Sequence, residues 1–208
     1  MKKITIIIIV LFTSIFISAQ NINSDDKLLA FKNSIEQESI GHYSDAISDI
    51  LKITDKYKSD YLVNLRLGWL YYLNKDYTNS ITFYKKAIQS GGENNIEAML
   101  GITLPLSGNG DWDGVKEYYK KVIDIDEHNY TANLRLGQIL LNTENYLNAK
   151  VYLSKVHEHY PGDYESNLYL AWTLYYLGDK STAKELFTKV LLLNPGDESA
   201  LEGMKLVK

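Results

Sequence analysis

The sequence predicts an all-α protein made of five repeated helix pairs that stack as an α-solenoid. Three observations support this. Small residues recur at spacings of 34, 35, 34 and 34 residues, namely Ala46, Ser80, Val115, Ala149 and Ala183. Within each period the apolar residues follow helical spacing, as in Leu67, Leu70 and Tyr71. Pro161 and Pro195 each lie 12 residues after the alanine of their period, where a proline ends the second helix.

A second set of small residues sets the expected register of the first helices: Ser34, Gly68, Gly101, Gly137 and Ala171. Each precedes the first set by 12 residues, except in the third period, where the distance is 14. We expect the two extra residues in a turn over 107–110, which has the sequence Ser-Gly-Asn-Gly. Pro105 is expected to kink the first helix of the third period or to end it early.

The first 19 residues have the pattern of a signal peptide. Lys2 and Lys3 precede an apolar stretch, and Ala19 supplies a small residue at the expected cleavage site. The alternative is a retained membrane anchor, but the stretch is nearer to about 15 apolar residues than to the roughly 20 that span a bilayer. Residues 20–26 are polar and are expected to be a flexible lead-in. This pattern predicts an exported bacterial protein, periplasmic or secreted, without a membrane span after cleavage.

Composition excludes several classes of function. The chain of 208 residues has no cysteine, which removes thiol nucleophiles, thiolate metal sites and disulfides. Its 22 basic and 26 acidic residues give a net charge of −4, and nucleic-acid binding needs clustered positive charge. Removing residues 1–19, which hold two lysines and no carboxylate, leaves 20 basic against 26 acidic residues and a charge of −6.

The periods also carry a recognisable motif. The second contains Asn64-x-x-Leu67-Gly68-x-x-Tyr71, followed by Tyr77, Ser80, Tyr84 and Ala87. With this pattern the chain resembles the tetratricopeptide-repeat (TPR) family, with repeats over about 27–60, 61–93, 94–129, 130–163 and 164–197 and a capping helix over 197–207. The first repeat departs from the pattern, because Ala30, Asn33 and Ser34 replace its usual residues.

The resemblance implies a function in protein binding. In TPR proteins, positions 2, 5, 9, 12 and 13 of each repeat face a concave groove that accepts a peptide or helix. In the second repeat these positions are Leu62, Leu65, Trp69, Tyr72 and Leu73. In the fourth they are Thr131, Leu134, Gln138, Leu141 and Asn142, and in the fifth Glu165, Leu168, Trp172, Tyr175 and Tyr176. Most of the 17 tyrosines suit core positions, so the best anchor candidates are Trp69, Tyr72, Trp172, Tyr175 and Tyr176.

Some relatives clamp a partner's terminal carboxylate with Lys, Asn and Arg side chains at five groove positions. Here only Arg135 matches, and the other four places hold Leu65, Trp69, Met99 and Thr131. The resemblance therefore implies no such clamp. Arg66 and Arg135 are expected either to pair with neighbouring carboxylates or to hold an acidic partner.

Two motifs imitate metal sites. The run Asn109 to Gly114 resembles the start of a calcium loop, but Lys120 stands where that loop needs a glutamate. His157 and His159 are two residues apart, so on a helix they point in different directions, and His42 and His128 are expected to be isolated in turns. No nucleophile motif or phosphate loop occurs. We therefore predict no metal and no cofactor.

Together these observations predict a non-enzymatic scaffold of the cell envelope that binds a peptide or helix of a partner protein in its groove. The alternative is a structural or assembly subunit that acts through self-association or through its end surfaces. The sequence leaves open the partner, the biological process and the oligomeric state.

Overall fold

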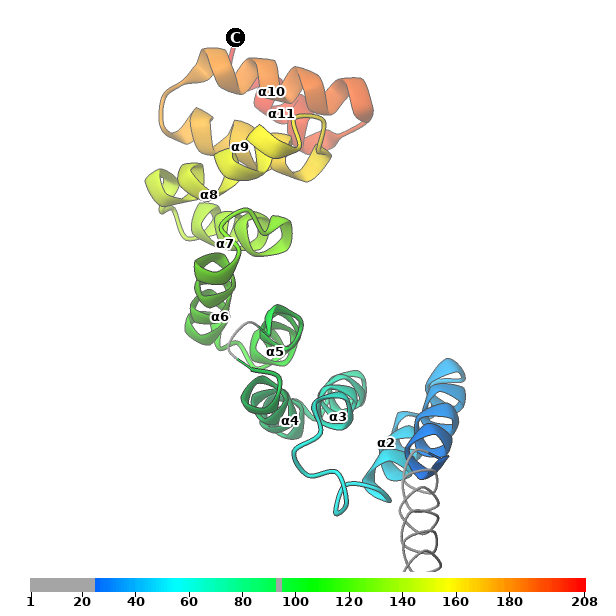
Figure 1. Ribbon diagram of the computed structural model, residues 1–208. Helices are drawn as coiled ribbons and strands as arrows, with labels where there is room; N and C mark the ends of the chain where they lie inside the picture. The colour runs from blue at the N-terminus through cyan, green and yellow to red at the C-terminus, as the bar shows by residue number, and fades with distance from the viewer. Residues whose placement is uncertain (1–24, 93–94) are drawn as a thin grey trace, which may run out of the picture. The chain divides into compact units, whose positions relative to one another are not determined.

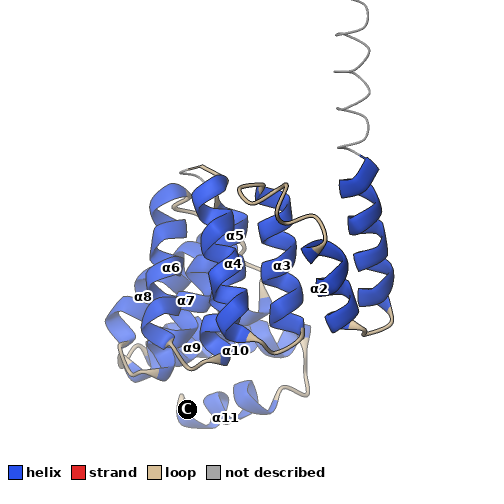
Figure 2. Ribbon diagram, turned by 90° about the horizontal axis from the view of Figure 1, so that it is seen from below, coloured by secondary structure: helices blue, strands red, loops and turns tan. Residues whose placement is uncertain are grey.

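Helices form all the regular structure in the residues described, 25–92 and 95–208 of a computed structural model (Figure 2). These residues form two compact units, with the boundary along the chain between Gly110 and Asp111. The predicted signal peptide and residues 20–24 of the predicted lead-in lie outside the described residues. Residues 25 and 26, which were also assigned to the lead-in, are already helical.

The first unit contains a helical segment over 25–39 and four further helices (Figure 1). These are α2 (Tyr43–Leu51), α3 (Tyr61–Leu73), α4 (Tyr77–Ser90) and α5 (Ile96–Gly108). The second unit contains α6 (Trp112–Ile125), α7 (Tyr130–Asn142), α8 (Tyr146–His159), α9 (Tyr164–Tyr176), α10 (Lys180–Leu193) and α11 (Glu198–Leu206). Each predicted repeat range holds two helices, and α11 lies in the range predicted for the capping helix.

Helix lengths repeat as regularly as the sequence does. The first helices α3, α5, α7 and α9 each have 13 residues, and the second helices α4, α6, α8 and α10 each have 14. The exception is α2, which has 9 residues and passes into turns. The first repeat therefore departs from the others in structure as it does in sequence.

The expectations for the third repeat were wrong in two respects. The first helix does not end early: α5 continues through Pro105 to Gly108 and matches the other first helices in length. The turn after it also has the ordinary length, because three residues separate α5 from α6 just as three separate α3 from α4. The eighth residue of α5, equivalent to Gly68, is Thr103 rather than Gly101. The additional residue instead lies in the 91–95 segment, which has five residues where the later inter-repeat turns have four.

Side chains at the helix starts explain where the helices begin. An Asp or Asn precedes each helix from α3 to α11, and in all but α8 its side chain accepts a hydrogen bond from a backbone N–H in the first turn. Asp60 and Asp163 illustrate the pattern, with acceptor distances of 3.0 Å to the Val63 nitrogen and 2.7 Å to the Ser166 nitrogen. Such caps satisfy backbone donors that have no partner within the helix.

Small residues allow the helices of a pair to approach closely. A Cβ atom on Gly68 of α3 would lie 2.8 Å from the Tyr84 ring of α4, and the Ser80 hydroxyl donates to the Gly68 carbonyl at 2.7 Å. At the other end of the chain, a Cβ on Gly203 would lie 2.3 Å from the fully buried ring of Phe187. The capping helix α11 therefore packs directly on α10, as a cap that covers a stacking face must.

Two hollows on the first helices

The first hollow lies in the first unit and has a volume of about 380 Å³. Three of its residues, Leu62, Leu65 and Trp69, were predicted from the repeat register and lie on one face of α3 because they are spaced i, i+3 and i+7. Phe31 and Leu104 add apolar surface from the neighbouring repeats. Leu62 is 50% exposed and Leu104 is 39% exposed, so apolar surface remains open to solvent here.

The Trp69 side chain is held within the first hollow. Its indole N–H donates to the Glu38 carboxylate at 2.7 Å, and its ring lies 5.7 Å from the Tyr72 ring. Glu38 also forms an ion pair with Arg66, whose Nε donates to the Ser34 hydroxyl at 3.0 Å. Trp69 is thus partly a core residue, since it packs against the apolar cluster of the first unit.

The second hollow lies in the second unit and has a volume of about 360 Å³. Five predicted groove positions line it from α7 and α9: Leu141, Asn142, Leu168, Trp172 and Tyr176. The sequence did not predict its other lining residues, which are Glu144, Tyr146, Tyr169 and Ser199. The structure therefore brings together predicted residues from two consecutive repeats.

Aromatic rings dominate the second hollow. The Tyr146 and Tyr176 rings stack at 4.7 Å between centroids, and Tyr176 stacks on Trp172 at 5.9 Å. The Trp172 indole N–H donates to the Ser199 hydroxyl of α11 at 2.8 Å, and its ring meets the buried Phe187 edge-on at 5.1 Å. Tyr175 packs beside Trp172 and Tyr176 but does not line the hollow. The capping helix therefore also orients a hollow residue.

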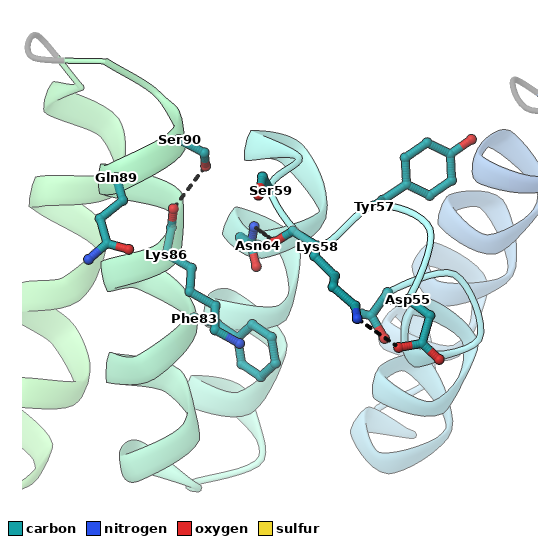
Figure 3. A pocket seen from close by; sticks show the side chains of 10 residues that line it. Asp55, Tyr57, Lys58, Ser59, Asn64, Phe83, Lys86, Gln89 and Ser90 are labelled. Carbon is teal, nitrogen blue, oxygen red and sulfur yellow. Dashed lines mark hydrogen bonds and ion pairs between the residues drawn. The ribbon is translucent and has the colours of Figure 1, made fainter.

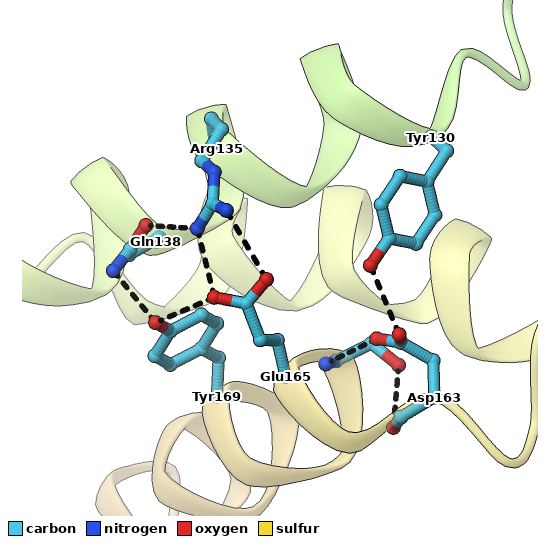
Figure 4. A network of polar contacts seen from close by, with 7 residues as sticks. Tyr130, Arg135, Gln138, Asp163, Glu165 and Tyr169 are labelled. Carbon is cyan, nitrogen blue, oxygen red and sulfur yellow. Dashed lines mark hydrogen bonds and ion pairs between the residues drawn. The ribbon is translucent and has the colours of Figure 1, made fainter.

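Two predicted groove residues have other roles. Leu134 is only 1% exposed and belongs to the same apolar cluster as Leu153 and Leu170, so it is a core residue and its assignment to the groove is corrected. Gln138 is bound within the protein: its amide N–H donates to the Tyr169 hydroxyl at 2.7 Å, and its oxygen accepts from Arg135 at 3.1 Å (Figure 4). Repeat position alone did not reveal the burial of Leu134, because Leu168 at the equivalent position of the next repeat is half-buried.

The two arginines pair with carboxylates of neighbouring repeats, which confirms one of the two expectations. Arg135 makes a bidentate pair with Glu165 at 3.0 and 3.1 Å (Figure 4), and that pair raises the pKa of Arg135. Arg66 pairs with Glu38. Both guanidinium groups are therefore engaged inside the chain.

A ladder of hydrogen bonds, which the sequence reading missed, links one repeat to the next. The first residue of a repeat donates to the side chain that caps the first helix of the following repeat. Its rungs are Lys27 to Asp60 at 2.6 Å, Tyr61 to Asn95 at 3.1 Å, Tyr130 to Asp163 at 2.9 Å, and Tyr164 to Asp197. Burial and the adjacent carboxylate, Glu97 or Asp163, raise the pKa of Tyr61 and of Tyr130 to about 12. These tyrosines therefore keep their protons and remain donors.

A third hollow, of about 550 Å³, lies in the first unit beside the turns after α2 (Figure 3). None of the predicted groove residues lines it. Most of its side chains are polar, and its charged groups have partners: Lys58 lies 3.8 Å from Asp55, and the Lys86 ammonium lies 4.5 Å from the centre of the Phe83 ring. The charged groups of this third hollow are therefore already engaged within the protein.

The rejected metal motifs have structural roles. Asp111 caps α6 by accepting from the Gly114 N–H at 2.9 Å, and Asp113 pairs with Lys116 at 2.8 Å. The expectation that His128 is isolated was wrong, because its ring lies 4.3 Å from that of His159. Burial, with a contribution from the charge of Lys189, lowers the pKa of His157, which favours the neutral imidazole.

The described residues contain neither a candidate metal site nor a candidate membrane span. No group of three or more histidine, aspartate or glutamate side chains in the described ranges could hold a metal ion. None of the helices there is long and apolar enough to cross a membrane.

Comparison with known proteins identifies the repeats. Residues 35–95, 130–158 and 165–197 each match a family model described as tetratricopeptide repeat. No curated protein sequence matches the chain closely enough to count as a relative.

Several solved structures have a similar fold. YrrB, described as a TPR protein with an unusual peptide-binding site, is 19% identical; the match covers 91% of this chain and 97% of YrrB, with a TM-score of 0.71. A tetratricopeptide repeat protein from Parabacteroides merdae is 16% identical over 88% of this chain and 72% of that one, with a TM-score of 0.75. MamA is 15% identical over 81% and 92% of the two chains, with a TM-score of 0.70. The chain therefore carries tetratricopeptide repeats and has the all-α fold of the TPR solenoids.

Proposed function

We propose that this protein is a non-enzymatic docking protein that holds a peptide or helical segment of another protein on its first helices. The observation that carries the proposal is the pair of hollows, each lined by tryptophan and other apolar side chains that the repeat register aligns on one helix face. Aromatic anchors in such hollows are where binding energy concentrates. The similarity to YrrB, described as peptide-binding, supports the same function.

We place the docking protein outside the cytoplasm, in the periplasm or beyond. The support is the sequence of residues 1–19, with Lys2 and Lys3 before an apolar stretch and a small residue at the expected cleavage site. The lack of cysteine suits an oxidising compartment, since no thiol is present to form a wrong disulfide.

Substitution of the most exposed hollow residues tests the proposal. Tyr176→Ser in the second hollow and Leu62→Ser in the first remove contact surface from side chains that are 51% and 50% exposed. We expect each to weaken partner capture from the protein's own cells about 5- to 30-fold, corresponding to roughly 1–2 kcal/mol. Quantitative crosslinking of the mature protein, with identification of the captured partner, measures the effect.

The matched control is Leu147→Ser on α8, because Leu147 is 73% exposed but lines neither hollow. It should leave capture unchanged. Equal capture by all three variants and the wild type would show that the hollows do not dock the partner.

A second candidate function is assembly through the first helical segment. Leu28, Leu29 and Ile35 are 70%, 58% and 55% exposed, which is unusual for three large apolar residues on one short segment. Sedimentation of the mature chain separates the two functions. A stable oligomer that Leu28→Gln dissociates favours assembly, and a monomer favours docking.

A further inference from the structure

The second hollow contains a carboxylate without a cation. Of its lining residues only Glu144 carries a charge, and among the described residues Glu144 forms no ion pair. Most other carboxylates near the first helices do have partners, as Glu165 has Arg135 and Glu38 has Arg66. The second hollow therefore combines aromatic and polar surface with the negative charge of Glu144.

The backbone at Glu144 is also unusual. Its φ is +59°, in the left-handed region. Three of the four equivalent turns have glycine at this position, with φ of +78° at Gly41, +74° at Gly110 and +88° at Gly178. A residue with a side chain is strained in this conformation. Turn geometry therefore favours glycine, and the glutamate needs another explanation.

The aromatic rings beside Glu144 suit the stem and charge of a basic side chain. Tyr146 and Tyr176 stack with an interplanar angle of 14°, and Tyr176 and Trp172 with an angle of 29°, so the three rings form one nearly continuous row. The faces of tyrosine and tryptophan attract cations, and guanidinium groups stack on them. Tyr176 is 51% exposed, which leaves part of this row open to a ligand.

The basic side chain that lies over the neighbouring Tyr175 ring is occupied elsewhere. The Lys180 ammonium lies 5.8 Å from the centre of the Tyr175 ring and donates to the Leu206 carbonyl at 3.4 Å. Burial and the negative charge of Glu144 raise the pKa of Tyr146. Among the residues that the structure describes, no basic side chain forms an ion pair with Glu144.

We propose that the second hollow binds an arginine or lysine side chain of the docked partner, with its stem on Trp172 and Tyr176 and its charge beside Glu144. This inference rests on the proposed docking function and names the chemistry of the partner segment. A neutral apolar anchor, or a second copy of this chain, is the competing occupant that the experiment separates from it.

The test uses two small probes of equal size on the mature protein: acetyl-arginine methylamide, and acetyl-citrulline methylamide, which lacks the charge. Titration is followed by the ¹⁵N–¹H resonance of the Trp172 indole, with the Trp112 indole as an internal reference. We expect saturable shifts with the arginine probe and at least about fivefold weaker binding of the citrulline probe. Glu144→Gln should weaken the arginine probe by a similar factor and leave the citrulline probe unchanged.

The control is Glu185→Gln on α10, an exposed carboxylate of the same unit that does not line the hollow, and it should bind as the wild type does. An unchanged Trp172 resonance in the free Glu144→Gln variant shows that the fold is intact. Equal binding of the two probes, binding of neither, or no effect of Glu144→Gln overturns the inference. If Tyr176→Ser abolishes partner capture while the probes bind alike, docking stands and only the charge preference falls.

Discussion

Lys75 and Glu144 are held in a backbone conformation that glycine adopts in the other turns between paired helices. Their φ angles are +61° and +59°. In both turns the next residue donates its N–H to the carbonyl five residues earlier, Asp76 to Tyr71 and Asn145 to Leu140, at 2.9 and 2.8 Å. This is the helix-ending bond pattern that requires a left-handed residue. The turn geometry therefore does not explain why these two residues are not glycine.

Replacing either residue by glycine should stabilise its unit. Lys75→Gly and Glu144→Gly remove the strain of a side chain in the left-handed region. The free energy recovered exceeds the cost of the added conformational entropy of the unfolded chain. We therefore expect the free energy of unfolding to rise by about 0.5–1 kcal/mol for each variant. Urea denaturation monitored by helical circular dichroism measures it. The reverse change, Gly178→Ala, should destabilise by a similar amount; stabilisation by alanine there would contradict this explanation.

At the residue scale the sequence predicted well wherever helical spacing alone decides position. Leu168, Trp172 and Tyr176 are spaced by four residues, so their common face followed from helix geometry. Leu134 could not be placed this way, because its burial depends on which helices cover it. Glu144 and Ser199 could not be predicted either. Glu144 lies in a turn and Ser199 in the capping helix, and only the packing of the helices brings them to the hollow.

At the scale of elements, the same capping side chains that start the first helices also join the repeats. Asp163 accepts from the Ser166 N–H at the start of α9 and from the Tyr130 hydroxyl at the start of α7. The repeats are thus linked by polar contacts at their edges as well as by apolar packing. The motif pattern assigned most tyrosines to core positions and did not reveal this use of the hydroxyl groups.

Removing one rung should weaken the stack measurably. Tyr130→Phe keeps the ring and deletes the hydroxyl that donates to a carboxylate, so we expect a loss of about 1–2 kcal/mol in the stability of the second unit. Tyr176→Phe is the matched control, because the structure gives its hydroxyl no hydrogen bond among the described residues. Thermal and urea unfolding compare the two; equal stability of both variants would show that the ladder contributes nothing.

Element boundaries also show where sequence reasoning failed. Gly101 looked like the repeat's small residue, and choosing it over Thr103 displaced the register by two and placed an insertion in the wrong turn. Pro105 misled as well: α5 continues through it to Gly108, although the proline has no backbone N–H to donate within the helix. A single sequence does not distinguish Gly101 from Thr103 as the small residue of this repeat.

At the scale of the whole molecule, a regular period predicted the number of repeats, the helix pairs and the capping helix. This succeeded because every repeat solves the same packing problem, so errors in one period did not affect the others. The proposed docking function rests on what differs between repeats, namely the aromatic residues of the second and fifth. Those differences are individual residues on a shared scaffold, and fold alone does not identify their partner.

The most direct test of this account is site-specific photo-crosslinking in the protein's own cells. A benzophenone amino acid replaces Tyr176 in the second hollow or, in a parallel strain, Leu147 on α8. We expect a discrete crosslinked partner from position 176 and none from position 147. Crosslinking from position 147 alone, or equally from both positions, would contradict the claim that the protein docks its partner in the hollows of its first helices.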